Sequence, residues 1–290
     1  MRGKIKGALK VIPGIKKIYA AYTSLKILFK LNLIKTLIVN FRFLKWREAI
    51  KFPIYVYGKL KISQYSHGSI VIDSPLRPGM ILMGINFDDF SESRGCALLD
   101  IRGTLKFDGE CVFSVDTTVT VLERAEIHLG RFVAIGNGCR IKCYSHIDIG
   151  AFTRIAVEAQ VFDTNFHFIK NIKTGKICRN SSPIYIGPKC WIGNRTSIMH
   201  RTNLPEGCIV ASNSLLNKDY VAKGVESNSL LAGMPAKVLG DSQMRIFSIR
   251  AEQELYNFFT NNSNETYNFP LEIDNEIEDL IFYIETLKKK

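Results

Sequence analysis

The chain has 290 residues, of which 46% are hydrophobic and 23% are charged, which is ordinary for one or two soluble globular domains. Its net charge of +12 is uneven, because residues 1–61 contain fifteen Lys or Arg and one acid, Glu48, whereas the rest sums to −2. Aliphatic residues interleave with these cations, and Gly and Ser are scarce among them, which argues against nucleic-acid binding.

Residues 15–47 contain no Pro or Gly and are predicted to be helical. Lysines recur along them, so no uncharged run reaches about 18 residues, and neither a membrane span nor a secretory signal is expected. Two interpretations stay open for this basic segment. It packs on the rest of the protein or on a neighbouring subunit, with its lysine stems along the surface, or it is an amphipathic anchor on an anionic membrane.

A repeat of six residues is the main signal downstream. A step of six from residue 186 meets only aliphatic residues: Ile186, Ile192, Ile198, Leu204, Val210 and Leu216. The same step links Leu129, Ile135, Ile141 and Ile147. After a shift of two residues it continues through Ile149, Ile155 and Val161. A weaker series is Ile101, Phe107, Phe113 and Val119. A period of six suits neither a helix nor an ordinary hairpin. It predicts a parallel β-helix, in which three short strands make one coil and each coil bonds to the next.

The repeat stops after Val161 and resumes at Ile186. The interruption, residues 163–183, predicts a loop of about twenty residues, and such loops in compact domains are usually functional or disordered. It contains His167, whose imidazole titrates near neutral pH and suits proton transfer. From its position alone, a catalytic role and a loop histidine without a role are equally good interpretations of His167.

The last part of the chain is predicted to hold two helices, at residues 241–260 and 274–290, that cover the last coil. The predicted organisation is therefore a basic, mainly helical N-terminal extension (1–61), a repeat domain (62–240) and a C-terminal helical extension (241–290). The seven cysteines include no CxxC pair, which is typical of reduced thiols in a cytosolic protein. Cys139 and Cys143 have no second pair of ligands at metal-site spacing, so no metal is expected there.

Two segments carry a resemblance to a known family: "IYIGPKCWIGNRTSIMHRTNLPEGCIVASNSLLNKDY" (184–220) and "NSLLAGMPAKVL" (228–239). With the coils upstream, they resemble the hexapeptide-repeat acyltransferases over about residues 99–240. The resemblance implies an all-β left-handed parallel β-helix, here with helical extensions at both ends. It also implies acetyl-CoA as co-substrate, no metal, and a homotrimer with active sites between subunits.

The resemblance also assigns a role to the interruption. In the O-acetyltransferase branch of the family, a loop at this place carries a Thr/Asp-x-x-His motif with a catalytic base, and His167 matches that histidine. Asp163 or Asn165 would orient its ring. Asn165 stands where an acid is frequent and Phe168 where proline is frequent, which leaves the orienting partner open.

Five residues match the family's positions for the acetyl donor. Asn194 would face the thioester end, while Ser212, Asn217 and Lys218 would meet the pantetheine arm. Lys237 would lie near the nucleotide phosphates, where a cation is useful. For Lys218 and Lys237, a solvated surface lysine is the alternative interpretation.

The leading prediction is acetyl transfer to a hydroxyl of a surface-polysaccharide sugar, in a capsule, an O-antigen or a precursor. "LIKTLIVNFRFL" and "FPIYVYGKLKI" resemble the leader of bacterial capsule and lipopolysaccharide O-acetyltransferases. This likeness implies a saccharide acceptor, in some cases lipid-linked, and a cytoplasmic enzyme held at the inner membrane through residues 1–47. The alternatives are transfer to a small sugar, serine or an amino-sugar nitrogen, and a non-catalytic scaffold.

One competing hypothesis concerns His128 and His146, which lie 18 residues apart, the length of one coil. Stacked on each other, with a third histidine from a neighbouring subunit, they would resemble the zinc site of γ-class carbonic anhydrases of similar fold. The slip between Ile147 and Ile149 argues against this stacking.

Overall fold

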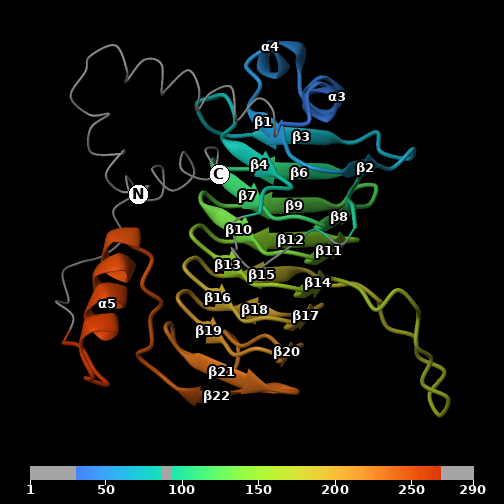
Figure 1. Cartoon of the computed structure of the whole chain (residues 1–290). Coiled ribbons are helices and arrows are strands. Elements are labelled where there is room, and N and C mark those ends of the chain that lie inside the picture. Colours follow the sequence, from blue (N-terminus) through green and yellow to red (C-terminus); the bar gives the residue numbers. More distant parts are fainter. Residues whose placement is uncertain (1–30, 87–92, 94, 269–290) are drawn as a thin grey trace, which may run out of the picture.

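The computed structural model describes residues 31–86, 93 and 95–268. Most of this chain winds through three sheets of short strands stacked along one axis, and almost all strand pairs are parallel (Figure 1). The first sheet contains β1 (Ile54–Val56), β4 (Ile81–Met83), β7 (Cys111–Phe113), β10 (Val133–Ile135), β13 (Arg154–Ile155), β16 (Trp191–Ile192), β19 (Ile209–Val210), β21 (Leu230–Gly233) and the antiparallel β22 (Ala236–Gly240).

The second and third sheets complete each coil. The second contains β2 (Leu60–Ile62), β5 (Ala97–Ile101), β8 (Thr118–Val121), β11 (Arg140–Cys143), β14 (Gln160–Phe162), β17 (Ser197–Met199) and β20 (Leu215–Leu216). The third contains β3 (Ser69–Ile72), β6 (Thr104–Phe107), β9 (Glu126–Leu129), β12 (His146–Ile149), β15 (Ile184–Ile186) and β18 (Asn203–Leu204). The predicted all-β left-handed parallel β-helix with helices near its ends is confirmed.

The core is a set of columns in which the repeat residues of successive coils lie over one another. In the second sheet, Val119 faces Ile141, which faces Val161, and the column continues through Ile198 to Leu216. All five side chains are at most 2% exposed. One inward side chain per short strand fills the narrow interior, and this produces the period of six.

The third sheet explains the slip in the repeat. Its longer strands turn two side chains inward, as Ile147 and Ile149 do in β12. The coils upstream are therefore longer than 18 residues, so that Ile141 faces Val161, 20 residues on. His128 consequently faces Asp148, while His146 faces Glu126. The stacking of the two histidines, which a coil of 18 residues would produce, does not occur.

Helix α3 (Leu33–Phe43) closes the open edge of the first sheet. Its buried Asn40 makes the hydrogen bonds that a further strand would make to β1. The side-chain amide donates to the carbonyl of Ile54 at 2.7 Å and accepts the N–H of Ile54 at 3.2 Å. Thr36 accepts the N–H of Val56 at 3.0 Å. Polar side chains on a helix thus satisfy backbone groups that an exposed edge would leave open.

The ends differ in part from the predicted extensions. The N-terminal helical segment breaks after Phe43 and continues as α4 (Trp46–Ala49), and β1 and β2 already form the first coil within the segment assigned to the extension. Of the two predicted C-terminal helices, α5 (Ile249–Asn261) lies beside the lower coils (Figure 1). Residues 15–30 and 274–290 lie outside the described residues.

Candidate active site

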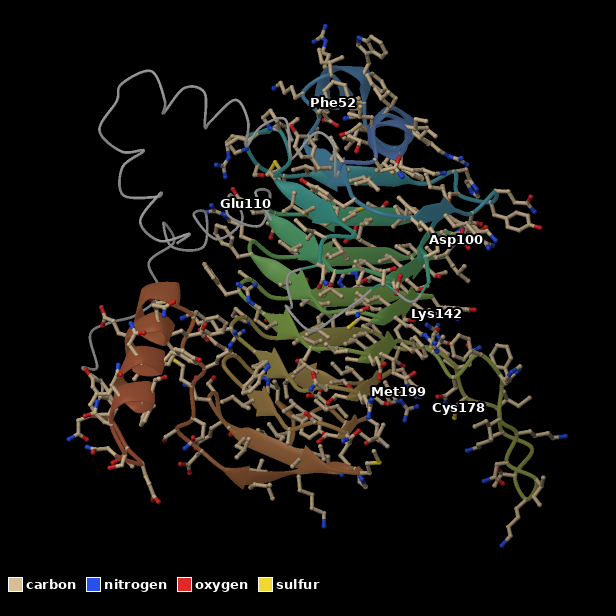
Figure 2. All side chains as sticks on the ribbon, in the orientation of Figure 1. Phe52, Asp100, Glu110, Lys142, Cys178 and Met199 are labelled. Carbon is tan, nitrogen blue, oxygen red and sulfur yellow. The ribbon has the colours of Figure 1, made fainter. Side chains whose placement is uncertain are left out.

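Residues 163–183 form an arm that leaves the solenoid between β14 and β15, at the corner joining the second sheet to the third. We call this the arm corner. The arm is a hairpin held by bridges between Thr164 and Ser181 at its root and between Lys170 and Ile177 nearer its tip. It projects away from the coils, with Cys178 on the arm and Lys142 near its root (Figure 2). The predicted loop is therefore an ordered hairpin.

Asp163 fixes the root of the arm to the coil before it. Its fully buried carboxylate accepts the backbone N–H groups of Tyr144 at 2.8 Å, Ser145 at 2.6 Å and His146 at 3.0 Å. Burial raises the pKa of this carboxyl, against the opposing effect of the three N–H donors. Both oxygens of Asp163 are thus engaged by backbone, and among the described residues neither contacts the ring of His167.

The next residues make a tight turn that places His167. The N–H of His167 donates to the carbonyl of Asn165 at 2.7 Å, and Phe166 between them has φ of 64°. This is a γ-turn with a left-handed central residue, which is strained for a side chain other than glycine. Such a conformation persists only where surrounding contacts hold it.

Those contacts come from an aromatic clamp around Phe166. Its ring lies 5.7 Å from that of Tyr144 and 5.6 Å from that of Phe162, both edge to face, and Lys142 Nζ lies 5.4 Å from its centre. We did not predict the clamp from the sequence, because its members come from neighbouring coils and follow no shared period. The aromatic residues at 162 and 166, four apart, are the only local signal.

The clamp leaves the imidazole of His167 exposed. Within the described part of the chain the ring makes no hydrogen bond or ion pair, so the orienting partner predicted at Asp163 or Asn165 is not seen in contact with it. Asn165 supplies only backbone bonds, to the N–H of His167 and the carbonyl of Asn180. The arrangement therefore offers a solvent-facing imidazole on a backbone that the turn holds in place.

His200 lies on the next coil at the same arm corner. Burial, followed by the charge of Arg201, lowers its pKa, and Asp163 acts in the opposite direction. Its Nδ1 is buried without a hydrogen-bond partner in the described chain. The ring is half-buried at this corner, and its lowered pKa favours the neutral form.

Four of the five residues predicted to bind the acetyl donor lie at two corners. Asn194 and Ser212 meet at the corner between the first and second sheets, where the N–H of Asn194 donates to Ser212 Oγ at 3.1 Å. Asn217 and Lys218 follow β20 at the arm corner. The outer face of the second sheet separates the two pairs, and the structure joins neither pair to His167.

The donor set at these positions fits an extended ligand with amides and phosphates. Asn194 Oδ1 accepts the N–H of Val157 at 3.2 Å, which leaves its amide NH₂ to donate. Lys237 is exposed on β22, opposite Ala232 of the last coil. Neither Lys218 nor Lys237 has an ion-pair partner within the described residues, so both charges are available to an anion.

His128 is held by acids instead of histidines. Its Nδ1 lies 2.8 Å from Asp148 Oδ2, and its Nε2 lies 2.8 Å from Asp108 Oδ1. Burial lowers its pKa, but the bonds to Asp148 and Asp108 outweigh this, and the net pKa is raised. In the described part of the chain no group of three His, Cys, Asp or Glu side chains can hold a metal ion.

No family model matches the chain. It is 24% identical over 160 residues to the Escherichia coli (strain K12) protein WbbJ, whose name describes a lipopolysaccharide biosynthesis O-acetyl transferase; the match covers 50% of this chain and 79% of WbbJ. It is 27% identical over 139 residues to the Mycobacterium tuberculosis protein Rv3034c, named as an acetyltransferase, covering 47% of this chain and 44% of that protein.

Among solved structures, the polysialic-acid-specific acetyltransferase NeuO is 18% identical, with a TM-score of 0.44, over 72% of this chain and 94% of that chain. The matches to curated proteins confirm the resemblance to hexapeptide-repeat O-acetyltransferases that the sequence indicated.

Proposed function

We propose that the chain is an acyltransferase that moves the acetyl group of acetyl-CoA to a hydroxyl of a surface-polysaccharide sugar, in a capsule, an O-antigen or a precursor. The observation that carries this proposal is the arm: a strained turn at Phe166, held by aromatic contacts, presents the exposed ring of His167. The named activity of WbbJ supports the acceptor class.

His167 acts as the general base in this proposal. Its unprotonated ring nitrogen takes the proton of the acceptor hydroxyl as the oxygen attacks the acetyl carbon, and returns it to the departing sulfur. Acetyl-CoA, when bound, supplies the acetyl group as an activated thioester. The transfer is direct, so no residue of the chain carries the acetyl group. A backbone N–H or a small polar group stabilises the charge that develops on the carbonyl oxygen.

Asn194, Ser212, Asn217, Lys218 and Lys237 hold the co-substrate in this proposal. The free NH₂ of Asn194 and the hydroxyl of Ser212 suit the amides of the pantetheine arm, and the cation of Lys237 suits phosphates. Isothermal calorimetry with CoA tests this assignment. Lys237→Ala is expected to weaken CoA binding about tenfold, whereas Lys223→Ala, at an exposed lysine that we give no role, leaves it unchanged.

We place the active sites between the subunits of a homotrimer. The support is that the arm points away from its own coils and that the His167 ring has no partner within the described part of its own chain (Figure 1). Light scattering of the purified protein is expected to give three times the chain mass of 32.8 kDa. An active monomer would contradict the placement.

Replacing His167 tests the function itself. His167→Ala is expected to lower kcat by about a hundredfold to ten-thousandfold in an assay of CoA release with polysaccharide fragments, small sugars, serine and amino sugars as acceptors. Lys176→Ala, on the same arm, is the control. Activity near that of the wild type would reject His167 as base. Transfer only to small acceptors would favour the alternative acceptors, and no binding of CoA at all would favour a scaffold.

We also propose that the protein is cytoplasmic and lies at the inner membrane of a bacterium through residues 1–47. The described part of this segment, with the residues directly after it, has an outward apolar face formed by Leu33, Ile34, Leu37, Ile38, Phe41, Trp46 and Ile50, each at least 37% exposed. Residues 31–51 carry five cations and one acid, which complements an anionic lipid surface. No helix in the described ranges is long and apolar enough to cross a bilayer.

Fluorescence tests the membrane proposal directly, because the chain has two tryptophans and Trp46, 70% exposed, lies on the proposed face. In the full chain with Trp191→Phe, anionic phosphatidylglycerol vesicles are expected to shift Trp46 emission to shorter wavelength, and neutral vesicles are not. Leu37→Glu abolishes the shift and Val71→Glu, on the third sheet, does not. Emission that is already blue-shifted without lipid would show that protein covers the face and would reject the proposal.

A further inference from the structure

A polar hollow of about 380 Å³ opens on the arm corner, in the first three coils. It is formed where β2, β5 and β8 turn into β3, β6 and β9. Its polar lining consists of His67, Ser69, Arg102, Thr104, Arg124 and Glu126. None of these residues belongs to the candidate active site described above, so the hollow needs its own explanation.

Two glycines let the coils stack closely beside the hollow. A Cβ on Gly68 would overlap the carbonyl of Gly103, and a Cβ on Gly103 would overlap the carbonyl of Ala125. The coils therefore stack backbone against backbone at this corner, with no room for a side chain between them. The glycines of the hollow's lining thus lie on closely stacked coil backbone.

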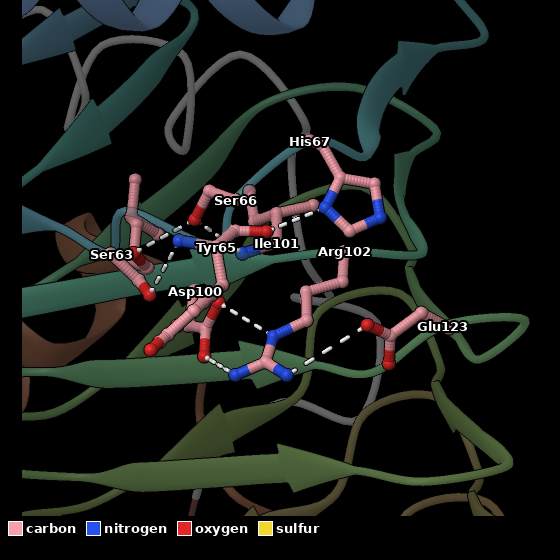
Figure 3. Close-up of polar contacts among 9 residues, drawn as sticks. Ser63, Tyr65, Ser66, His67, Asp100, Ile101, Arg102 and Glu123 are labelled. Atoms are coloured by element: carbon pink, nitrogen blue, oxygen red, sulfur yellow. Dashed lines mark hydrogen bonds and ion pairs between the residues drawn. The ribbon is translucent and has the colours of Figure 1, made fainter.

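Arg102 lines the hollow, and Figure 3 shows the contacts that hold its guanidinium. Its Nε and Nη2 donate to the two oxygens of Asp100 at 3.2 and 2.9 Å, and its Nη1 lies 3.8 Å from Glu123. Its guanidinium carbon lies 5.1 Å from the centre of the Tyr65 ring. The bond to Asp100 is the main reason that the pKa of Arg102 is raised. Two carboxylates thus offset its charge.

His67 has a defined hydrogen-bonding pattern at the rim. Its Nδ1 lies 2.6 Å from the carbonyl oxygen of Tyr65 (Figure 3). A carbonyl only accepts, so Nδ1 carries the proton, and in the neutral ring Nε2 is an acceptor. Ser69 and Thr104 add hydroxyls that donate and accept, and Tyr65, 59% exposed, adds an aromatic surface beside them.

The chemistry of the lining selects the class of ligand. Asp100 and Glu123 pair with Arg102, and Glu126 lines the hollow together with Arg124, so the hollow has no excess positive charge for a phosphate. Closely spaced donors and acceptors beside an aromatic ring instead suit an uncharged, hydroxyl-rich ligand, which is the chemistry of a sugar unit.

The position relates the hollow to the arm. Both lie on the same corner, and three coil steps separate the turn at Arg102 from the turn where the arm leaves. At the usual strand spacing this is about 14 Å. One sugar ring is too short to reach from one to the other, whereas a saccharide chain running along the corner spans both.

We propose that this hollow is a distal acceptor subsite, which binds a sugar unit of the polysaccharide several units away from the unit that is acetylated. The proposal rests on the proposed function, and it makes the enzyme selective for chains over single repeat units. Binding energy at the hollow holds the chain along the arm corner, so its loss raises KM for long acceptors and leaves the chemical step unchanged.

Kinetics on acceptors of two lengths test the subsite. The acceptors are single repeat units and longer fragments, both prepared from the surface polysaccharide of the cells that make the protein. The double variant His67→Ala, Arg124→Ala is expected to raise KM for the longer fragments about tenfold, with kcat, KM for acetyl-CoA and KM for single units unchanged. Replacing His67→Ala by His67→Gln in this double variant keeps a donor and an acceptor, and it is expected to lower KM for the longer fragments part of the way back. Arg140→Ala, at an exposed arginine of β11, is the control.

The outcomes separate the two proposals. If the wild type transfers acetyl groups to the fragments and the double variant has the same KM for the longer ones, the subsite is overturned and the function stands. Transfer to no fragment overturns the function and the subsite with it. Inorganic phosphate that competes with the longer fragments in the wild type but not in the double variant would identify an anion site and reject a neutral sugar site. Both substituted side chains are exposed, and an unchanged Tm confirms that the variants fold.

Discussion

The carboxylate of Asp163 accepts the backbone N–H of Ser145 at 2.6 Å, which ties the start of the arm to the preceding coil. This contact, with those to Tyr144 and His146, makes Asp163 a positioning residue for the arm. Its effect on His167 passes through the backbone between them and through the clamp on Phe166. The distinction between an anchor and a direct partner of the imidazole is open to experiment.

Asp163→Ala is expected to lower the free energy of unfolding by about 3 kcal/mol, because three backbone donors lose a carboxylate acceptor. Asp163→Asn costs less, since the amide oxygen still accepts. Urea unfolding followed by circular dichroism measures both. Acetyl transfer is expected to fall in the same order as stability. A variant with full stability and no activity would instead indicate that Asp163 acts directly on the ring of His167.

The clamp predicts a separation of catalysis from co-substrate binding. Phe166→Ala removes the ring that packs on Tyr144 and Phe162, so the strained turn relaxes and His167 loses its fixed place. We expect kcat to fall at least tenfold, while CoA binding by calorimetry stays unchanged. Phe168→Ala is the matched control, because that ring is 68% exposed on the same arm. Equal kcat values for the two variants would contradict the role of the clamp.

His128 predicts a dependence of stability on pH. Although burial opposes it, bonding to Asp148 and Asp108 raises its pKa in the folded state above the unfolded value of about 6.5. The charged ring therefore stabilises the fold fully below about pH 6.5, and this contribution is lost as pH rises through the raised folded pKa. Unfolding free energies of wild type and His128→Gln, measured from about pH 5 to about pH 9, are expected to converge as pH rises.

Asp148→Asn provides the second arm of that experiment. It removes the carboxylate that contacts Nδ1 of His128 and keeps the ring, so it is expected to reduce the same pH-dependent difference. Parallel pH profiles for the wild type and both variants would show that the raised pKa has no consequence for stability.

Close coil stacking predicts different responses at two glycines. A Cβ on Gly150 would overlap the backbone of Gly187 and Pro188, whereas a Cβ on Gly240 meets nothing within 4 Å. Gly150→Ala is expected to lower the free energy of unfolding by about 2 kcal/mol, and Gly240→Ala to change it by less than about 0.5 kcal/mol. Thermal and urea unfolding give both values. A loss at Gly150 as small as the one at Gly240 would mean that the coils can move apart at little cost.

Much of the solenoid is predictable from the sequence because a narrow core imposes a local rule. Each short strand must turn a side chain inward, so the step of six from Ile186 to Leu216 marks buried positions through the spacing of aliphatic residues alone. The same rule did not reveal that strands such as β12 turn two side chains inward. Coil length is set by how strands pair between coils, and it decides that His128 meets Asp148.

The repeat, the place of the arm and the residue suited to proton transfer can all be recognised from residues that are neighbours in the chain. What holds His167 in place depends on tertiary contacts. The contacts of Asp163 with Ser145 and of Phe166 with Tyr144 join residues about one coil apart, and the stacking of Gly68 on Gly103 joins residues farther apart still. These pairs meet only because the register of the strands brings successive corners over one another, and that register follows from the packing of the whole core.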